Sequence, residues 1–175
     1  MTVHVLLTLM LLIPDADLRV PKIGPQLRAI DAAAARLITE GVERSPTLAA
    51  LVDRLERSDV IAYVETESCR NQPWAGRLRF VTAAGARRFL RIGVCAELRR
   101  TVQIAMLAHE LQHAVEIAGS NAYESEAVRA LYERIGVQGE PIDGVPCFDT
   151  AAAVAVGRAA LRDILTSRAT RILGY

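Results

Sequence analysis

The chain contains little histidine, little cysteine and few aromatic residues, and its basic residues form no long run. Three of 175 residues are His, aromatic residues make up 5%, and the formal net charge is +1. Nucleic-acid-binding domains usually carry a basic stripe with interleaved aromatic residues. We therefore predict no nucleic-acid partner. Pairs such as Arg87-Arg88 and Arg99-Arg100 are more typical of a solvated face.

Cysteine is too scarce for a zinc site built from four thiolates. The three cysteines are Cys69, Cys95 and Cys147, and no two of them form a CxxC pair. An exported chain could form one disulfide and keep one free thiol, although the sequence does not specify the pairing. Buried free thiols are the alternative. Cys147 has no His nearby in the sequence, so we do not predict a cysteine nucleophile.

No apolar run near the N-terminus is long enough to cross a membrane as a helix. The run over residues 5–13 has instead the length of the apolar part of a secretory signal, and Ala16 could mark a cleavage point. No Lys or Arg precedes the run, and a buried first strand or helix is the alternative. We predict a signal peptide over residues 1–16, export to a periplasmic or extracellular space, and one domain over residues 17–175.

The most informative segment that is present spans residues 109–113, with the sequence His-Glu-Leu-Gln-His. On a helix, His109 and His113 lie one turn apart on the same face, where two imidazoles can bind one zinc ion. Glu110 can then accept a proton from the water that the metal activates. The flanking residues 104–108 are uncharged, as a buried active-site helix requires. The alternative is that both His are ordinary polar residues of an amphipathic helix in a structural protein without metal.

This segment resembles the zincin metallopeptidases, whose shared motif is HExxH with apolar neighbours. The resemblance implies a zinc cofactor, a peptide or protein substrate, and Glu110 as the general base. It is closest to the gluzincin type, because no third His follows at the metzincin spacing. A non-catalytic zincin-like binding or regulatory domain is the alternative function. An oxyanion donor stays open among Tyr123, Tyr132 and Arg129.

A carboxylate should therefore supply the third zinc ligand. If the helix ends at Gly119 in a tight turn, position 113 faces position 126 on the next helix, so we predict that Glu126 completes the site. Glu116 shares a helix face with His113, but its other role would be to orient that His or to pair with an Arg. The remaining candidates are Asp149, which could equally be a plain helix cap, and Glu124.

The pattern of apolar residues predicts an α+β fold that is mostly helical. We expect a small antiparallel sheet, packed on a helix hairpin that carries the zinc motif. The expected helices cover residues 25–43, 46–58, 101–118, 122–135 and 149–167, and the expected strands cover residues 60–64, 77–81 and 88–94.

Overall fold

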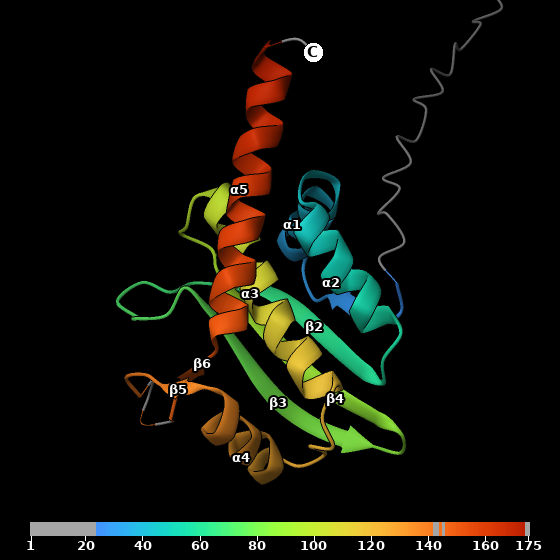
Figure 1. The fold of residues 1–175 in the computed structure, drawn as a ribbon. Helices are drawn as coiled ribbons and strands as arrows, with labels where there is room; N and C mark the ends of the chain where they lie inside the picture. Colours follow the sequence, from blue (N-terminus) through green and yellow to red (C-terminus); the bar gives the residue numbers. More distant parts are fainter. Residues whose placement is uncertain (1–23, 142–143, 145, 174–175) are drawn as a thin grey trace, which may run out of the picture.

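The computed structural model describes residues 24–141, 144 and 146–173, and Figure 1 shows their arrangement. The predicted signal peptide over residues 1–16 lies outside the described residues. Within them, no helix combines the length and the apolar character that a membrane span needs. The elements in chain order are β1 (Leu27–Ala29), α1 (Ala32–Arg44), α2 (Pro46–Glu56), β2 (Val60–Glu67), β3 (Gly76–Ala84), β4 (Arg87–Cys95), α3 (Arg100–Ala118), α4 (Ser125–Ile135), β5 (Val137–Gln138), β6 (Phe148–Asp149) and α5 (Ala151–Leu173).

The main sheet has four strands in the order β1-β2-β4-β3. The α+β class is confirmed, but the sheet is mixed and not wholly antiparallel. Only β3 and β4 pair antiparallel, as predicted, and they form a β-hairpin that turns at Gly85 with a φ of 56°. The strands β1, β2 and β4 run parallel to one another. The residues of β1 were expected to begin a helix, but they pair with β2 instead.

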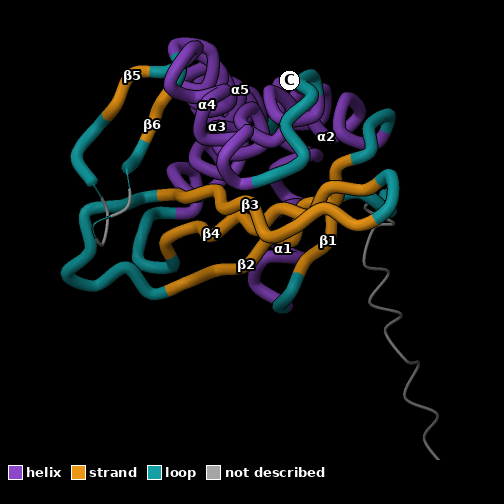
Figure 2. Tube along the Cα trace, turned by 90° about the horizontal axis from the view of Figure 1, so that it is seen from below, coloured by secondary structure: helices purple, strands orange, loops and turns teal. Residues whose placement is uncertain are grey.

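One face of the sheet forms the core. Alternate residues of β2 and β4, such as Val64, Leu90 and Ile92, are fully buried against the helices. The opposite face carries charged residues, including the ion pair between Arg91 and Glu65. Figure 2 shows most of the helical layer on one side of the sheet. The alternation of apolar and charged residues along these strands therefore gives the sheet one buried and one charged face.

Helix α3 runs through the middle of the helical layer and contacts the sheet, α1, α2 and α5. Gly41 of α1 lets Ile104 approach, since a Cβ on Gly41 would lie 3.2 Å from the Ile104 side chain. Leu107 and Leu111 are fully buried. The uncharged flanks of the zinc motif are therefore explained by burial of this helix on nearly all sides.

The C-terminal end of α3 is capped by Arg88, which is only 1% exposed. Its guanidinium donates to the carbonyl oxygens of Ala118 and Ser120, both at 2.9 Å, and pairs with Asp59 at 2.8 Å. The prediction of a solvated face is therefore wrong for Arg88, although it is correct for the exposed Arg87. A cation at this end of a helix also interacts favourably with the helix dipole.

Two of the three cysteines form a disulfide. Cys69 follows β2 and bonds to Cys95 at the end of β4, with a Cα–Cα distance of 5.3 Å. Cys147 is free and half-buried. Of the arrangements that the sequence left open, the structure thus has one disulfide and one free thiol.

Candidate metal centre

Helix α3 places both histidines of the motif on one face. The ring centroids of His109 and His113 are 5.0 Å apart. The side chains are 15% and 7% exposed, respectively, and both Nε2 atoms face Asp149. The helical spacing read from the sequence therefore does bring the two imidazoles together.

Asp149 supplies the carboxylate that lies beside both rings. Its Oδ1 atom is 3.3 Å from His109 Nε2 and 3.7 Å from His113 Nε2. Ligand atoms about 2.0–2.1 Å from a tetrahedral zinc lie about 3.3 Å from one another. One ligand atom from each of the three residues lies within 4.8 Å of the others. The donor set therefore fits a zinc ion, with two neutral nitrogens and one carboxylate oxygen.

The position of Asp149 depends on the two short strands β5 and β6 and on the start of helix α5. Strand β6 ends at Asp149 and pairs with β5, which places Val137 opposite it. Helix α5 begins two residues later, and the Thr150 hydroxyl accepts a hydrogen bond from Ala153 N–H at 3.1 Å as its cap. Gly136 permits this packing, since a Cβ there would lie 2.9 Å from the Asp149 carbonyl oxygen.

Glu126 does not belong to this cluster, and the expectation that it completes the site needs correction. It is exposed on α4 and lies near Arg129. The segment between α3 and α4 has six residues, 119–124, so it is not a tight turn. The longer segment shifts the pairing of the helices, and Tyr132 is the residue that faces His113, with ring centroids 5.3 Å apart. Glu124 is likewise exposed.

Glu116 orients one of the histidines, the other role that its position on the helix allowed. Glu116 Oε2 lies 3.0 Å from His113 Nδ1. Its Oε1 accepts hydrogen bonds from Thr150 Oγ1 at 2.8 Å and from Gln112 Nε2 at 3.2 Å. A carboxylate on Nδ1 keeps the proton on that nitrogen and leaves Nε2 free to bind a metal.

Glu110 is buried between α3 and the beginning of β3. A Cβ on Gly76 would lie 2.6 Å from Glu110 Oε1, so a larger residue there would require the carboxylate to move. Burial raises the pKa of Glu110 to about 7; the charge of His113 opposes this rise, and that of Asp149 adds to it. A carboxyl group with a pKa in this range is suited to exchange protons near neutral pH.

The two histidines have opposite pKa shifts. Burial lowers the pKa of His109, and the neighbouring His113 lowers it further. Burial would also lower the pKa of His113, but the hydrogen bond to Glu116 and the nearby carboxylates outweigh it and raise the pKa. The surrounding negative charge therefore favours a cation at this position, whether a proton or a metal ion.

None of the three candidate oxyanion donors points a free donor at the site. The Tyr132 hydroxyl donates to the His113 carbonyl oxygen at 3.0 Å. Arg129 pairs with Glu133 at 2.9 Å. The Tyr123 ring packs against the Arg88 guanidinium, whose central carbon lies 4.6 Å from the ring centroid. Tyr132 and Tyr123 thus have structural contacts of their own.

Sequence reasoning missed the residues that support the ligands. Thr150 links Glu116 to the start of α5. Gly157 lets α5 approach α3, since a Cβ on Gly157 would lie only 3.4 Å from His109 Cβ. A lone glycine in an Ala-rich helix was the available hint, because glycine inside a helix usually has a packing reason.

Comparison of the chain with known proteins gives no significant match, whether to a family model, to a curated protein or to a solved structure.

Proposed function

We propose that the protein is a zinc-dependent peptidase in which His109, His113 and Asp149 hold the metal. The observation that carries this proposal is the spacing of the three ligand atoms, with Oδ1 of Asp149 at 3.3 and 3.7 Å from the two imidazole nitrogens. The ligand set differs from the gluzincin type because an aspartate takes the place of the glutamate.

The residues around the metal divide the chemistry between them. Zinc, when bound, supplies a Lewis acid that acidifies a water molecule and polarises the peptide carbonyl. Glu110 takes a proton from the attacking water and passes it to the leaving amine. Glu116 keeps His113 in the tautomer that binds the metal.

Strand β3 is in a position to hold the substrate. It lies at the edge of the sheet, and its first residue, Gly76, packs against Glu110. An extended peptide could add to this edge through backbone hydrogen bonds, which would bring its carbonyl groups past the buried carboxylate. A peptide or protein substrate therefore suits the site.

One observation favours the alternative of a non-catalytic zincin-like domain. Glu110 is only 5% exposed, although a general base must reach the attacking water. Asp149 is more accessible, with 49% of its side chain exposed. Both functions predict that the site binds zinc. They differ in whether the protein hydrolyses peptide bonds with Glu110 as the general base.

Zinc content tests the ligand set. We expect about one zinc per chain in the purified wild-type protein. Asp149→Ala and His113→Ala should lose the metal, while Glu126→Ala should keep it and serves as the matched control. Elemental analysis makes the measurement. Equal zinc in all four proteins would refute the assigned ligands, and loss in His113→Ala and Glu126→Ala but not in Asp149→Ala would restore the ligand first expected.

Hydrolysis of an unstructured protein such as casein separates the two functions. Glu110→Gln removes the proton acceptor with almost no change in shape, so it should retain zinc and lose activity by about two or more orders of magnitude. If wild type and variant cleave at the same rate, the peptidase proposal fails. Zinc binding without any cleavage by wild type would favour the non-catalytic domain.

Export remains a prediction. An oxidising compartment, as the predicted signal peptide implies, would preserve a bond such as Cys69–Cys95.

A further inference from the structure

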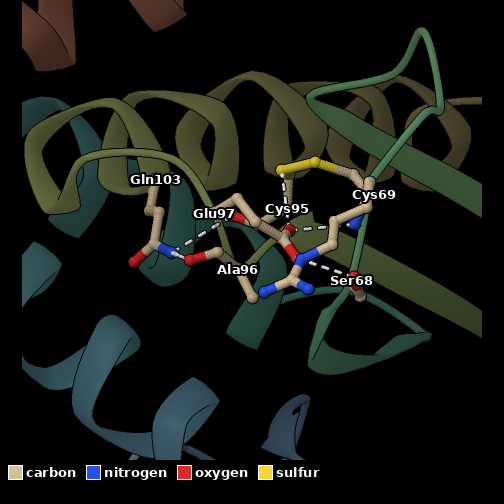
Figure 3. The surroundings of a disulfide bond; sticks show 7 residues. Ser68, Cys69, Cys95, Ala96, Glu97 and Gln103 are labelled. Carbon is tan, nitrogen blue, oxygen red and sulfur yellow. Dashed lines mark hydrogen bonds and ion pairs between the residues drawn. A yellow bond between two sulfur atoms is a disulfide. The ribbon is translucent and has the colours of Figure 1, made fainter.

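The disulfide lies beside a third potential metal ligand. Glu97 follows Cys95 by two residues, and its Oε2 atom is 3.5 Å from Cys95 Sγ. One ligand atom each from Cys69, Cys95 and Glu97 lies within 4.8 Å of the other two. Figure 3 shows the carboxylate of Glu97 turned toward the backbone of Cys69, next to the two sulfur atoms.

The Glu97 side chain and the backbone of both cysteines are held in place by contacts other than the bond between the sulfurs. Glu97 accepts hydrogen bonds from Ser68 Oγ at 2.6 Å and from Cys69 N–H at 2.9 Å. Gln103 Nε2 donates to the Cys95 carbonyl oxygen at 3.1 Å. The loop and the strand end would therefore stay together if the disulfide opened, which a preformed metal site requires.

We propose that Cys69, Cys95 and Glu97 form a second cation site, which binds a thiophilic divalent ion such as zinc when the disulfide is reduced. Two thiolates and one carboxylate provide three ligands, and water would complete a tetrahedral shell. This site lies apart from His109 and His113, and the proposal does not depend on the peptidase activity.

A dithiol can serve as the reductant that opens the Cys69–Cys95 disulfide. The dithiol is oxidised to its own disulfide, and two electrons and two protons pass to Cys69 and Cys95, which become thiols. Binding of a divalent ion then releases these two protons as the thiolates coordinate it. The redox state of the cysteine pair thus determines whether a covalent bond or a metal ion closes the loop.

Either the disulfide or a bound metal ion would constrain the loop that borders the site of His109 and His113. The loop after Cys69 leads directly to Gly76, the residue that packs against Glu110, and Cys95 N–H donates to the Ala75 carbonyl oxygen at 3.0 Å. A metal in the reduced protein would replace the disulfide as the constraint on this loop.

Cobalt(II) is the probe that tests the proposal, because thiolate ligands give it an intense charge-transfer band that His and Asp ligands do not. Metal-free protein is reduced with a dithiol, freed of reductant without oxygen, and titrated with cobalt(II). The reduced wild type should develop the band, and the band should saturate when one ion per chain is bound in addition to any cobalt that the His site takes up. The oxidised wild type should show no band, even where the His site takes up cobalt.

Two cysteine variants complete the design. Cys95→Ser should abolish the band in the reduced protein, whereas Cys147→Ser should leave it unchanged and is the matched control. Glu97→Gln should keep the band and weaken cobalt binding, because both thiolates remain. Absence of the band in reduced wild type, whether folded or unfolded by circular dichroism, overturns the proposal, as does its persistence in Cys95→Ser or its loss in Cys147→Ser.

Discussion

Glu116 is the residue that joins two parts of the candidate site. Through one oxygen it contacts His113 on α3, and through the other it accepts a hydrogen bond from Thr150 at the start of α5. Thr150 directly follows the proposed ligand Asp149, whose Oδ1 accepts a hydrogen bond from Thr150 N–H at 2.7 Å. A single carboxylate thus contacts both elements that carry the proposed ligands.

We therefore expect Glu116→Gln to weaken zinc binding about 10–100-fold, the usual effect of losing such a support. Its amide has only one acceptor oxygen, so it can serve either His113 or Thr150 but not both. Competition with a chromophoric chelator gives the affinity, and nitrogen NMR of the imidazole gives the His113 tautomer. Glu124→Gln, at an exposed position, is the control. An unchanged affinity and tautomer in Glu116→Gln would contradict the positioning role.

The sequence predicted that His109 and His113 lie side by side, but it did not predict which carboxylate lies next to them. The HExxH spacing led to two imidazoles that do face one another, with centroids 5.0 Å apart. For the third ligand, several carboxylates were candidates, and only the path of the chain between α4 and α5 places Asp149 beside the imidazoles. The zinc itself stays a prediction.

At the scale of elements, boundaries marked by local chemistry were predicted well. Helix α2 begins at residue 46, as expected, with Ser45 as its cap, and α4 ends at residue 135, as expected, before Gly136. The length of the α3–α4 connection was not predicted, because nothing in residues 119–124 distinguishes a short turn from an extended linker. That difference in length is why the prediction placed Glu126 beside His113, whereas the structure places Asp149 there.

The end of α3 depends on Arg88, so we predict that Arg88→Met destabilises the protein by about 3–5 kcal/mol. The variant leaves the carbonyl groups of Ala118 and Ser120 without their donor and removes the partner of Asp59. Arg88 now lowers the pKa of Asp59, chiefly through its hydrogen bonds and charge, with burial opposing. Urea unfolding followed by circular dichroism measures the free energy of unfolding.

The neighbouring Arg87 provides the control for this prediction. It is exposed, so Arg87→Met should change the free energy of unfolding by less than about 0.5 kcal/mol. Similar effects of the two substitutions would show that the capping contacts of Arg88 contribute nothing specific.

For the whole molecule, the class of fold follows from the sequence but the strand pairing does not. Alternating and helical periods identify strands and helices and hence the α+β class. Parallel pairing of β1 with β2, and of β2 with β4, joins segments that are distant along the chain. Such pairing is determined by how helices pack on the sheet. Strand β1 has only three residues, which is too few for a recognisable strand pattern in the sequence.

Long-range contacts also attach α5 to the rest of the molecule. Asp163 on α5 accepts hydrogen bonds from Ser45 Oγ at 2.8 Å and from Thr47 N–H at 3.0 Å, at the N-terminus of α2. Burial would raise the pKa of Asp163, but these hydrogen bonds outweigh it and lower the pKa below its usual value. The carboxylate therefore binds α2 best when it is ionised.

This contact predicts how stability depends on pH. A carboxyl group whose pKa is lower in the folded than in the unfolded state stabilises the fold above its unfolded pKa. That contribution is lost as the pH falls from about 5 toward the lowered pKa. Asp163→Asn should cost about 0.3–1 kcal/mol at neutral pH, the usual contribution of a negative charge at a helix N-terminus. The difference from wild type should shrink on acidification, because the wild-type carboxylate then loses its charge as well.

Urea unfolding over a series of pH values measures this difference, with Asp53→Asn on the exposed face of α2 as the control. If the difference between wild type and Asp163→Asn is the same at neutral and acidic pH, or if Asp53→Asn matches it, then ionised Asp163 does not hold α5 against α2.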